Sequence, residues 1–195
     1  APAMKWAQKG IEGGVDGLVC VNERAGGHAG FKSAQRMHDE LNGLGLPLIC
    51  AGGIGGRQDF VEAIKIGYAG VQMGTRFIAT KESGTFDAHK TMLVESRAED
   101  VLFTDAIAGM PASFLRPSMI ANGLDPDKLP PPKGMHKPDL PEGLRAWKHI
   151  WSGGHSTGLI DDVPSVADLV GRLGQEFAAA RHPGDWRAAL ARSLT

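Results

Sequence analysis

Residues 46–56, Leu-Pro-Leu-Ile-Cys-Ala-Gly-Gly-Ile-Gly-Gly, decide the fold. An apolar run without alternation is typical of a strand that is buried on both faces. The glycines that follow let backbone N–H groups approach a ligand closely. Apolar Phe60, Ala63 and Ile64 then recur at helical spacing, and Gly67 stands where such a helix would end. The stretch therefore predicts a buried strand, a glycine turn and a helix.

Two further units of the same kind flank this one. Residues 17–21 form an apolar run that leads into Ala25–Gly30, and residues 70–73 form another that leads into Gly74. Helical patterns precede the first run and join it to residues 46–51. The order is αβαβαβ with short connections, which predicts an α/β fold with parallel strands and right-handed crossovers. We assign these elements to a first unit, residues 1–83.

Residues 84–195 follow a different pattern and are expected to form a helical extension with a proline-rich loop, packed on the first unit. A helix is expected over residues 86–96, and the prolines of residues 125–141 predict a loop. The remaining expectations are one or two helical turns over 143–151 with Trp147 and Trp151 on one packed face, a helix that starts at Pro164 with Asp162 as its cap, and a short helix over 185–194.

Composition excludes several classes of function. The net charge is −1 with both signs mixed along the chain, so nothing favours nucleic acid or an anionic membrane as a partner. No apolar run approaches the ~20 residues that span a bilayer. Cys20 and Cys50 lie in apolar runs, which indicates reduced thiols and a cytoplasmic protein. The histidines and cysteines lack metal-ligand spacing, so no metal is expected.

The three glycine turns predict a phosphate-bearing cofactor site with a base beside it. His28 lies between glycines at the end of a strand, where an imidazole could take a proton from a carbon acid; a loop histidine without a role is the alternative. Gly52 and Gly53 precede a helix and, with Gly74 and Thr75, match phosphate binding by the last two strands of a (β/α)₈ barrel. The alternative is that these glycines serve turn geometry alone. Arg76 could pair with a phosphate, although a structural carboxylate is the commoner partner.

Several motifs together resemble the nitronate monooxygenases, formerly called 2-nitropropane dioxygenases. They are Ala25–Gly30, Ala51–Gly53, Val71–Ser83, Trp151–Gly154 and Gly158–Asp162, and the likeness extends over roughly residues 1 to 175. It implies an FMN-dependent (β/α)₈ TIM barrel that oxidises alkyl nitronates with dioxygen and without a metal. Nitronate or nitroalkane and dioxygen are the partners that it implies.

The resemblance also implies roles for particular residues. His28 matches the family's catalytic base or substrate-contacting histidine. The residues that match flavin contacts are Gly26 and Gly27 at the backbone, Ala51, Gly52 and Gly53 in the first half of the phosphate loop, Gly74 and Thr75 in its second half, and Gln72 on the strand that faces the flavin.

A whole (β/α)₈ barrel takes about 250 residues, and the resemblance places only strands six to eight in this chain. We therefore expect the C-terminal part of a barrel, completed by a missing N-terminal half or by a partner in a homo-oligomer. Two alternatives to nitronate oxidation stay open. One is an FMN-dependent enoyl-[acyl-carrier-protein] reductase, which shares the Ala-Gly-Gly-His and Met-Gly-Thr-Arg-Phe motifs. The other is a flavin-binding fragment without catalysis.

Overall fold

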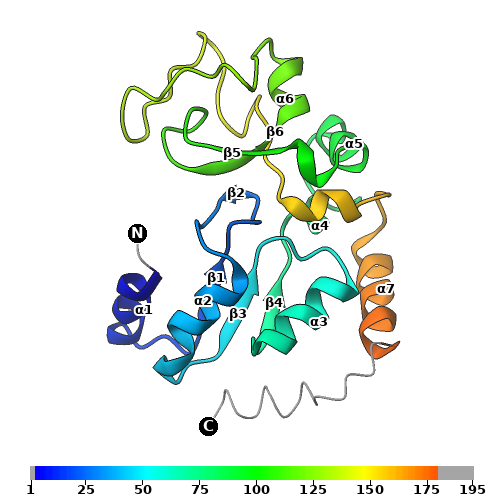
Figure 1. The fold of residues 1–195 in the computed structure, drawn as a ribbon. Coiled ribbons are helices and arrows are strands. Elements are labelled where there is room, and N and C mark those ends of the chain that lie inside the picture. Colours follow the sequence, from blue (N-terminus) through cyan, green and yellow to red (C-terminus); the bar gives the residue numbers. More distant parts are fainter. Residues whose placement is uncertain (1–2, 180–195) are drawn as a thin grey trace.

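A computed structural model describes residues 3–179 of the chain. Its lower part in Figure 1 is built on a parallel sheet of order β1-β3-β4, with Cys20 in register with Cys50 and Cys50 with Val71. The three strands and their order confirm the predicted αβαβαβ unit. Its elements are α1 (Ala3–Glu12), β1 (Leu18–Val21), α2 (Ala34–Leu41), the 3-10 helix η1 (Asn42–Leu44), β3 (Leu48–Ala51), α3 (Arg57–Ile66) and β4 (Gly70–Gln72).

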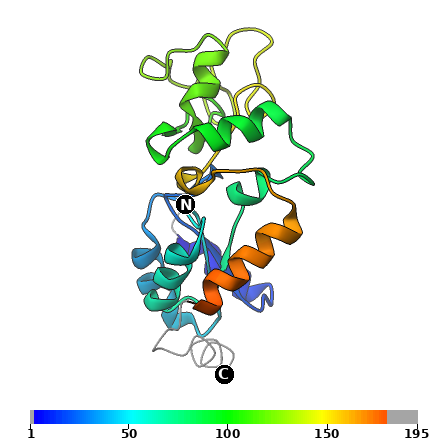
Figure 2. The same cartoon turned by 90° about the vertical axis from the view of Figure 1, so that its right-hand side faces the viewer.

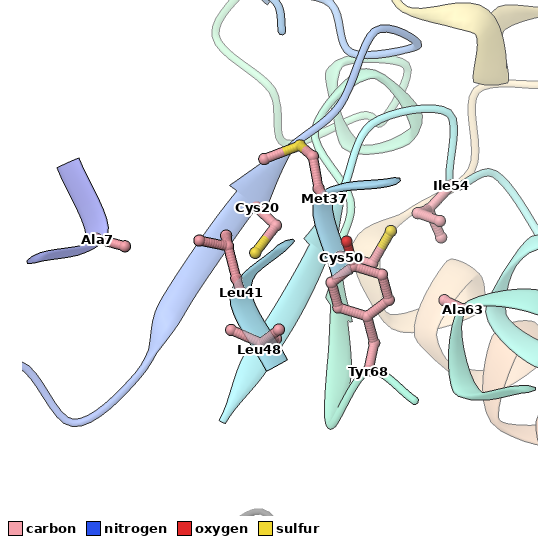
Figure 3. Packing of buried hydrophobic residues seen from close by; sticks show 9 residues of the cluster. All are labelled: Ala7, Cys20, Met37, Leu41, Leu48, Cys50, Ile54, Ala63 and Tyr68. Atoms are coloured by element: carbon pink, nitrogen blue, oxygen red, sulfur yellow. The ribbon is translucent and has the colours of Figure 1, made fainter. Parts of the chain in front are cut away.

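Helices α2 and α3 begin and end where local chemistry requires it. The Ser33 side chain caps α2 by accepting a hydrogen bond from the Arg36 N–H at 3.3 Å. Helix α3 ends at Gly67 as predicted, with φ at +119°. The core lies between these helices and one face of the sheet, where Tyr68 and Leu41 pack beside the two cysteines (Figure 3).

The two cysteines are free and buried. Burial raises the pKa of Cys20 to about 11, and the neighbouring Cys50 adds to this rise. Burial likewise raises the pKa of Cys50 to about 11, against a hydrogen bond from Asn22 that lowers it. Both side chains therefore stay as neutral thiols near pH 7 and act as small apolar core residues.

The opposite face of β1 is open. Val19 is 53% exposed and Val21 is 36% exposed, so the prediction that this strand is buried on both faces is wrong for the chain by itself. Within residues 3–179, no strand pairs with the outer edge of β1 or of β4. The sheet thus presents two unpaired edges and one bare apolar strand face.

A second sheet, which the sequence did not predict, forms the upper part in Figure 1. It is antiparallel with the order β2-β6-β5 and joins the turn after β1 to a hairpin in the later half of the chain. The expected helix over 86–96 is present as α5. Because strands β5 and β6 lie in the same later half of the chain, that half contains strands as well as helices. Its elements are β2 (Gly27–His28), α4 (Thr75–Ile78), α5 (Asp87–Glu95), η2 (Ala98–Asp100), β5 (Val101–Thr104), β6 (Ala112–Leu115), α6 (Arg116–Ala121), η3 (His155–Leu159) and α7 (Val166–Ala179).

Residues 125–141 form a loop as predicted, but the helical turns expected over 143–151 are absent. Hydrogen bonds between residues 145–150 close a tight turn there, and Trp147 has a positive φ, so Trp147 and Trp151 do not share a helix face. Helix α7 starts at Val166 rather than at Pro164. Its cap is Ser165, whose hydroxyl accepts from the Asp168 N–H at 3.1 Å; Asp162 is engaged elsewhere.

The chain crosses between the two parts several times. Helix α7 returns from the upper part and packs against α3, where the rings of Phe60 and Phe177 stack at 4.1 Å (Figures 1 and 2). The expected helix over 185–194 lies outside the described residues. None of the described helices is long and apolar enough to cross a membrane.

Candidate functional site

The predicted site residues converge on one pocket of about 310 Å³ between the two parts of the molecule. Its walls are the turns that follow β1, β3 and β4. All nine candidates line it: Gly26, Gly27, His28, Ala51, Gly52, Gly53, Gln72, Gly74 and Thr75. The structure adds residues that the sequence did not single out, namely Val21, Ala25, Ile54, Ile78, Ser152 and Ser156. Turns far apart in the sequence meet here because the carboxyl ends of parallel strands lie at the same edge of a sheet.

The turn after β3 offers backbone N–H groups to the pocket. Gly53 is buried with φ at +74°, and an added Cβ would lie 2.8 Å from the Cβ of Arg24. Glycine is therefore required there by both conformation and space. Within the described part of the chain, the N–H groups of Gly52 and Gly53 donate no hydrogen bond. Successive free N–H groups in such a turn form a concavity that binds anions.

The start of helix α3 itself is already occupied by carboxylates. The Gly55 N–H donates to Asp59 Oδ2 at 3.0 Å, and the Arg57 N–H donates to Glu176 Oε2 at 3.2 Å. These acidic groups satisfy the positive end of the helix dipole. The N–H groups at the start of α3 are therefore engaged by the protein itself, and those of the glycine turn ahead of it are the ones left for a ligand.

The turn after β4 supplies the opposite wall of the pocket. The Thr75 hydroxyl accepts from the Gly154 N–H at 3.0 Å, and its own proton makes no bond to another described residue. An added Cβ at Gly26 would lie 2.7 Å from the Gly154 nitrogen and 2.9 Å from Thr75 Oγ1, so the turns after β1 and β4 meet in close contact. Next to Thr75, the Gly74 N–H donates to no residue within 3–179.

His28 lies at the border between the two sheets. It pairs with Ala112 of β6 instead of lying in a free loop, and its side chain is exposed at the pocket. Its ring is 5.2 Å from the indole of Trp147. Among the described residues, none is hydrogen-bonded to the imidazole, which lines the pocket.

Asn22 is a positioning residue that sequence reasoning missed. It is 2% exposed; its Nδ2 donates to the Gly52 carbonyl at 3.0 Å, and its Oδ1 accepts from the Arg24 N–H at 2.8 Å. The side chain therefore ties the turn after β1 to the turn after β3. The available signal was an asparagine directly after an apolar strand, which is typical of an Asx turn.

His89 lies outside the pocket lining and contacts Ser152, which lines the pocket. Its Nε2–H donates to the Ser152 carbonyl at 3.0 Å, its Nδ1 lies 3.1 Å from the Thr85 hydroxyl, and its ring stacks on Trp151. Burial lowers the pKa of His89, against the bond to Ser152 that raises it. The ring is thus neutral near pH 7 and fixes the position of Ser152, which lines the pocket.

Arg76 binds a structural carboxylate, the commoner of the two readings of the sequence. Its Nη2 donates to Asp162 Oδ1 at 3.3 Å, and Arg172 donates to the other oxygen at 2.8 Å. Burial by itself raises the pKa of Asp162, but the hydrogen bonds from Arg172 and Arg76 outweigh it and hold that pKa below its ordinary value. Asp162 thereby joins Arg76 of α4 to Arg172 of α7. Within residues 3–179, no group of three or more potential metal ligands is present.

Comparison with known proteins places the chain in a family. The family model for nitronate monooxygenase matches residues 1–176. A probable nitronate monooxygenase of Staphylococcus saprophyticus is 29% identical over 164 residues, which are 72% of this chain and 45% of that protein. The chain thus spans about half the length of the curated relatives it matches.

Solved structures show the same fold. A nitroalkane oxidase from Streptomyces ansochromogenes has a TM-score of 0.73 at 23% identity, covering 91% of this chain and 56% of that one. FabK from Thermotoga maritima has a TM-score of 0.68 at 23% identity, covering 90% and 58%. The match of a mixed α/β fold over about half of each structure agrees with the match of the family model. The chain belongs to the nitronate monooxygenase family.

Proposed function

We propose that this chain carries the phosphate-binding turns and the base of an FMN-dependent nitronate monooxygenase. The observation that carries the proposal is the convergence of nine residues from three glycine-bearing turns on one pocket, with His28 at its border. Members of the family depend on FMN. The donors and the volume of the pocket can therefore be compared with what FMN requires.

The fit to a phosphate is good. Free N–H groups on the turn after β3 face a pocket whose other wall holds the Gly74 N–H and the unused proton of Thr75. A phosphate dianion needs such donors and no bulky side chain in front of them. At about 310 Å³ the pocket is at the small end for a ligand site, which suits the phosphate end of a flavin better than the whole molecule.

The residues of this chain then have distinct tasks. The phosphate would accept hydrogen bonds from the backbone N–H groups of Gly52, Gly53 and Gly74. The Thr75 hydroxyl would donate a further hydrogen bond to it. When bound, FMN supplies the redox chemistry between the organic substrate and dioxygen. His28 holds the nitronate oxygens when the substrate arrives as an anion, and takes the proton from the carbon next to the nitro group when it arrives as a neutral nitroalkane.

The proposal includes a second body of protein. The unpaired edges of β1 and β4 and the open face at Val19 and Val21 are surfaces that a barrel would cover. Strands from an N-terminal half, or from a partner chain, would pair with those edges and supply the remaining wall of the flavin site.

Two assays on the flavin-bearing protein test this function. Oxygen uptake with propyl nitronate and without NADH is the expected result. If NADH is consumed with a crotonyl thioester while the nitronate gives no oxygen uptake, the protein is an enoyl reductase and the proposal is wrong. A flavin absorbance band without either activity would support the non-catalytic alternative.

A further inference from the structure

Trp147 has a backbone conformation that a bulky residue rarely adopts. Its φ is +60°, and within the described residues the only other non-glycine residue with a positive φ is His136, at +58°. For a large side chain this left-handed conformation is an outlier that costs free energy. Such residues persist where the surrounding structure enforces them, and they gather at functional sites.

The turn that contains Trp147 is held at several points. The Trp147 N–H donates to the Ile150 carbonyl at 2.8 Å, and Ile150 is fully buried. The neighbouring His149 carbonyl accepts from Asn122 Nδ2 at 3.0 Å and from Ser118 Oγ at 3.3 Å. Helix α6 therefore anchors the turn, and the strained conformation presents the indole in a fixed place.

That place is beside the candidate base. The indole lies 5.2 Å from the His28 ring and 5.6 Å from the ring of Phe114, with interplanar angles of 41° and 43°. Phe114 is fully buried, whereas Trp147 is 43% exposed. One part of the indole therefore packs on the core of the upper sheet, and the rest offers an apolar surface to solvent next to His28.

We propose that Trp147 is a specificity-determining residue whose indole contacts the alkyl chain of a substrate held at His28. This inference rests on the proposed function, because it takes an alkyl nitronate as the substrate. A nitronate has a charged head and an apolar tail. With the head at the imidazole, the tail that lies against the exposed part of the indole is removed from water, and a longer chain gains more.

The test compares ethyl and hexyl nitronate in the flavin-bearing protein. Trp147→Gly removes the indole and leaves a residue that adopts a φ of +60° without strain. Trp147→Phe restores part of the aromatic surface. His136→Gly is the matched control, since it relieves the same strain at an exposed residue that makes no ring contact with His28. Dissociation constants are measured by calorimetry without oxygen on protein whose flavin has been reduced beforehand, so that the nitronate passes no electrons to it, and kcat/KM is measured by oxygen uptake.

We expect Trp147→Gly to lower the preference for hexyl over ethyl nitronate about tenfold, the size expected when one or two methylene groups of the longer chain stay in water. Trp147→Phe should show part of the original preference for hexyl nitronate, and His136→Gly should show all of it. An unchanged preference in Trp147→Gly, with oxygen uptake intact, would overturn the inference and leave the proposed function standing. A raised preference for hexyl nitronate would overturn it too, because the indole would then exclude the chain.

The binding data separate this inference from the proposed function. Chain-length preference in binding that depends on Trp147, without any oxygen uptake, would support the role of Trp147 and contradict the monooxygenase reaction. A protein that binds neither nitronate would contradict both.

Discussion

The role of His28 is tested by removing its imidazole. We predict that His28→Ala lowers kcat/KM for a neutral nitroalkane by ~10²–10⁴-fold, the usual contribution of a general base. Turnover of the preformed nitronate should fall less, because no proton has to be removed from it. FMN should stay bound, since the phosphate donors belong to the other turns. Oxygen uptake measures both rates, and equal losses on the two substrates would show that His28 only positions the substrate.

Gly53 tests the phosphate turn. Gly53→Asp should release FMN, because its carboxylate would lie among the donors of the turn and repel the phosphate. Gly53→Ala should also weaken FMN binding, since its φ is +74° and its Cβ would meet Arg24. Gly43→Asp adds the same charge at an exposed residue with open space around it and is the control. Flavin content after dialysis measures the effect; stoichiometric FMN in Gly53→Asp would disprove this turn as the phosphate site.

Sequence alone made His28 and Gly53 candidates for the site because histidine and glycine at strand ends have few roles. It could not predict the partners of Asn22 or Arg76, since each bond depends on which turn the fold brings close. Asn22 reaches across to the turn after β3, and Arg76 reaches Asp162, 86 residues later. The same limit applied to the carboxylates at the start of α3, where Glu176 comes from the distant helix α7.

His89, which bonds α5 to Ser152, makes the free energy of unfolding depend on pH. Burial lowers the pKa of His89 in the folded protein, so below its ordinary value of about 6.5 the unfolded chain binds a proton that the folded chain does not. We therefore predict that the free energy of unfolding falls as pH decreases through this range. His89→Gln keeps a donor for Ser152 and does not titrate. Urea unfolding from pH 7 to pH 5 should show a smaller fall for His89→Gln, and parallel curves would contradict the prediction.

The elements differed in how well sequence predicted them. Strands β1, β3 and β4 were predictable because each is an apolar run that ends at glycine and alternates with a helical pattern. Strand β2 has only two residues, and β5 and β6, although as long as β1 and β3, do not lead directly into a glycine turn. The turn with Trp147 resembled a helix by its i, i+4 spacing. Its positive φ is set by bonds within the turn and to α6, which no local pattern reveals.

The open sheet makes the state of association a test of the proposed barrel. Trp6, Val19 and Phe31 are large apolar residues that are more than half exposed, and β1 beside them has an unpaired edge. We predict that the 195 residues alone associate or precipitate. The same residues with a complementary barrel half should be dispersed and yellow. A flavin-saturated monomer of 20.6 kDa in sedimentation velocity would contradict this account of the missing wall.

The most direct test of the glycine pocket compares the affinities of FMN and riboflavin, which differ only by the phosphate. Flavin fluorescence titrations of the purified protein give both dissociation constants without any need for turnover. If two charge-assisted hydrogen bonds to the phosphate each contribute a net free energy of about 1.5 kcal/mol, FMN binds ~100-fold more tightly than riboflavin. Our account predicts a preference of at least this size, abolished in Gly53→Asp and kept in His28→Ala. Equal affinity for the two flavins would contradict the assignment of the turns after β3 and β4 to a phosphate site.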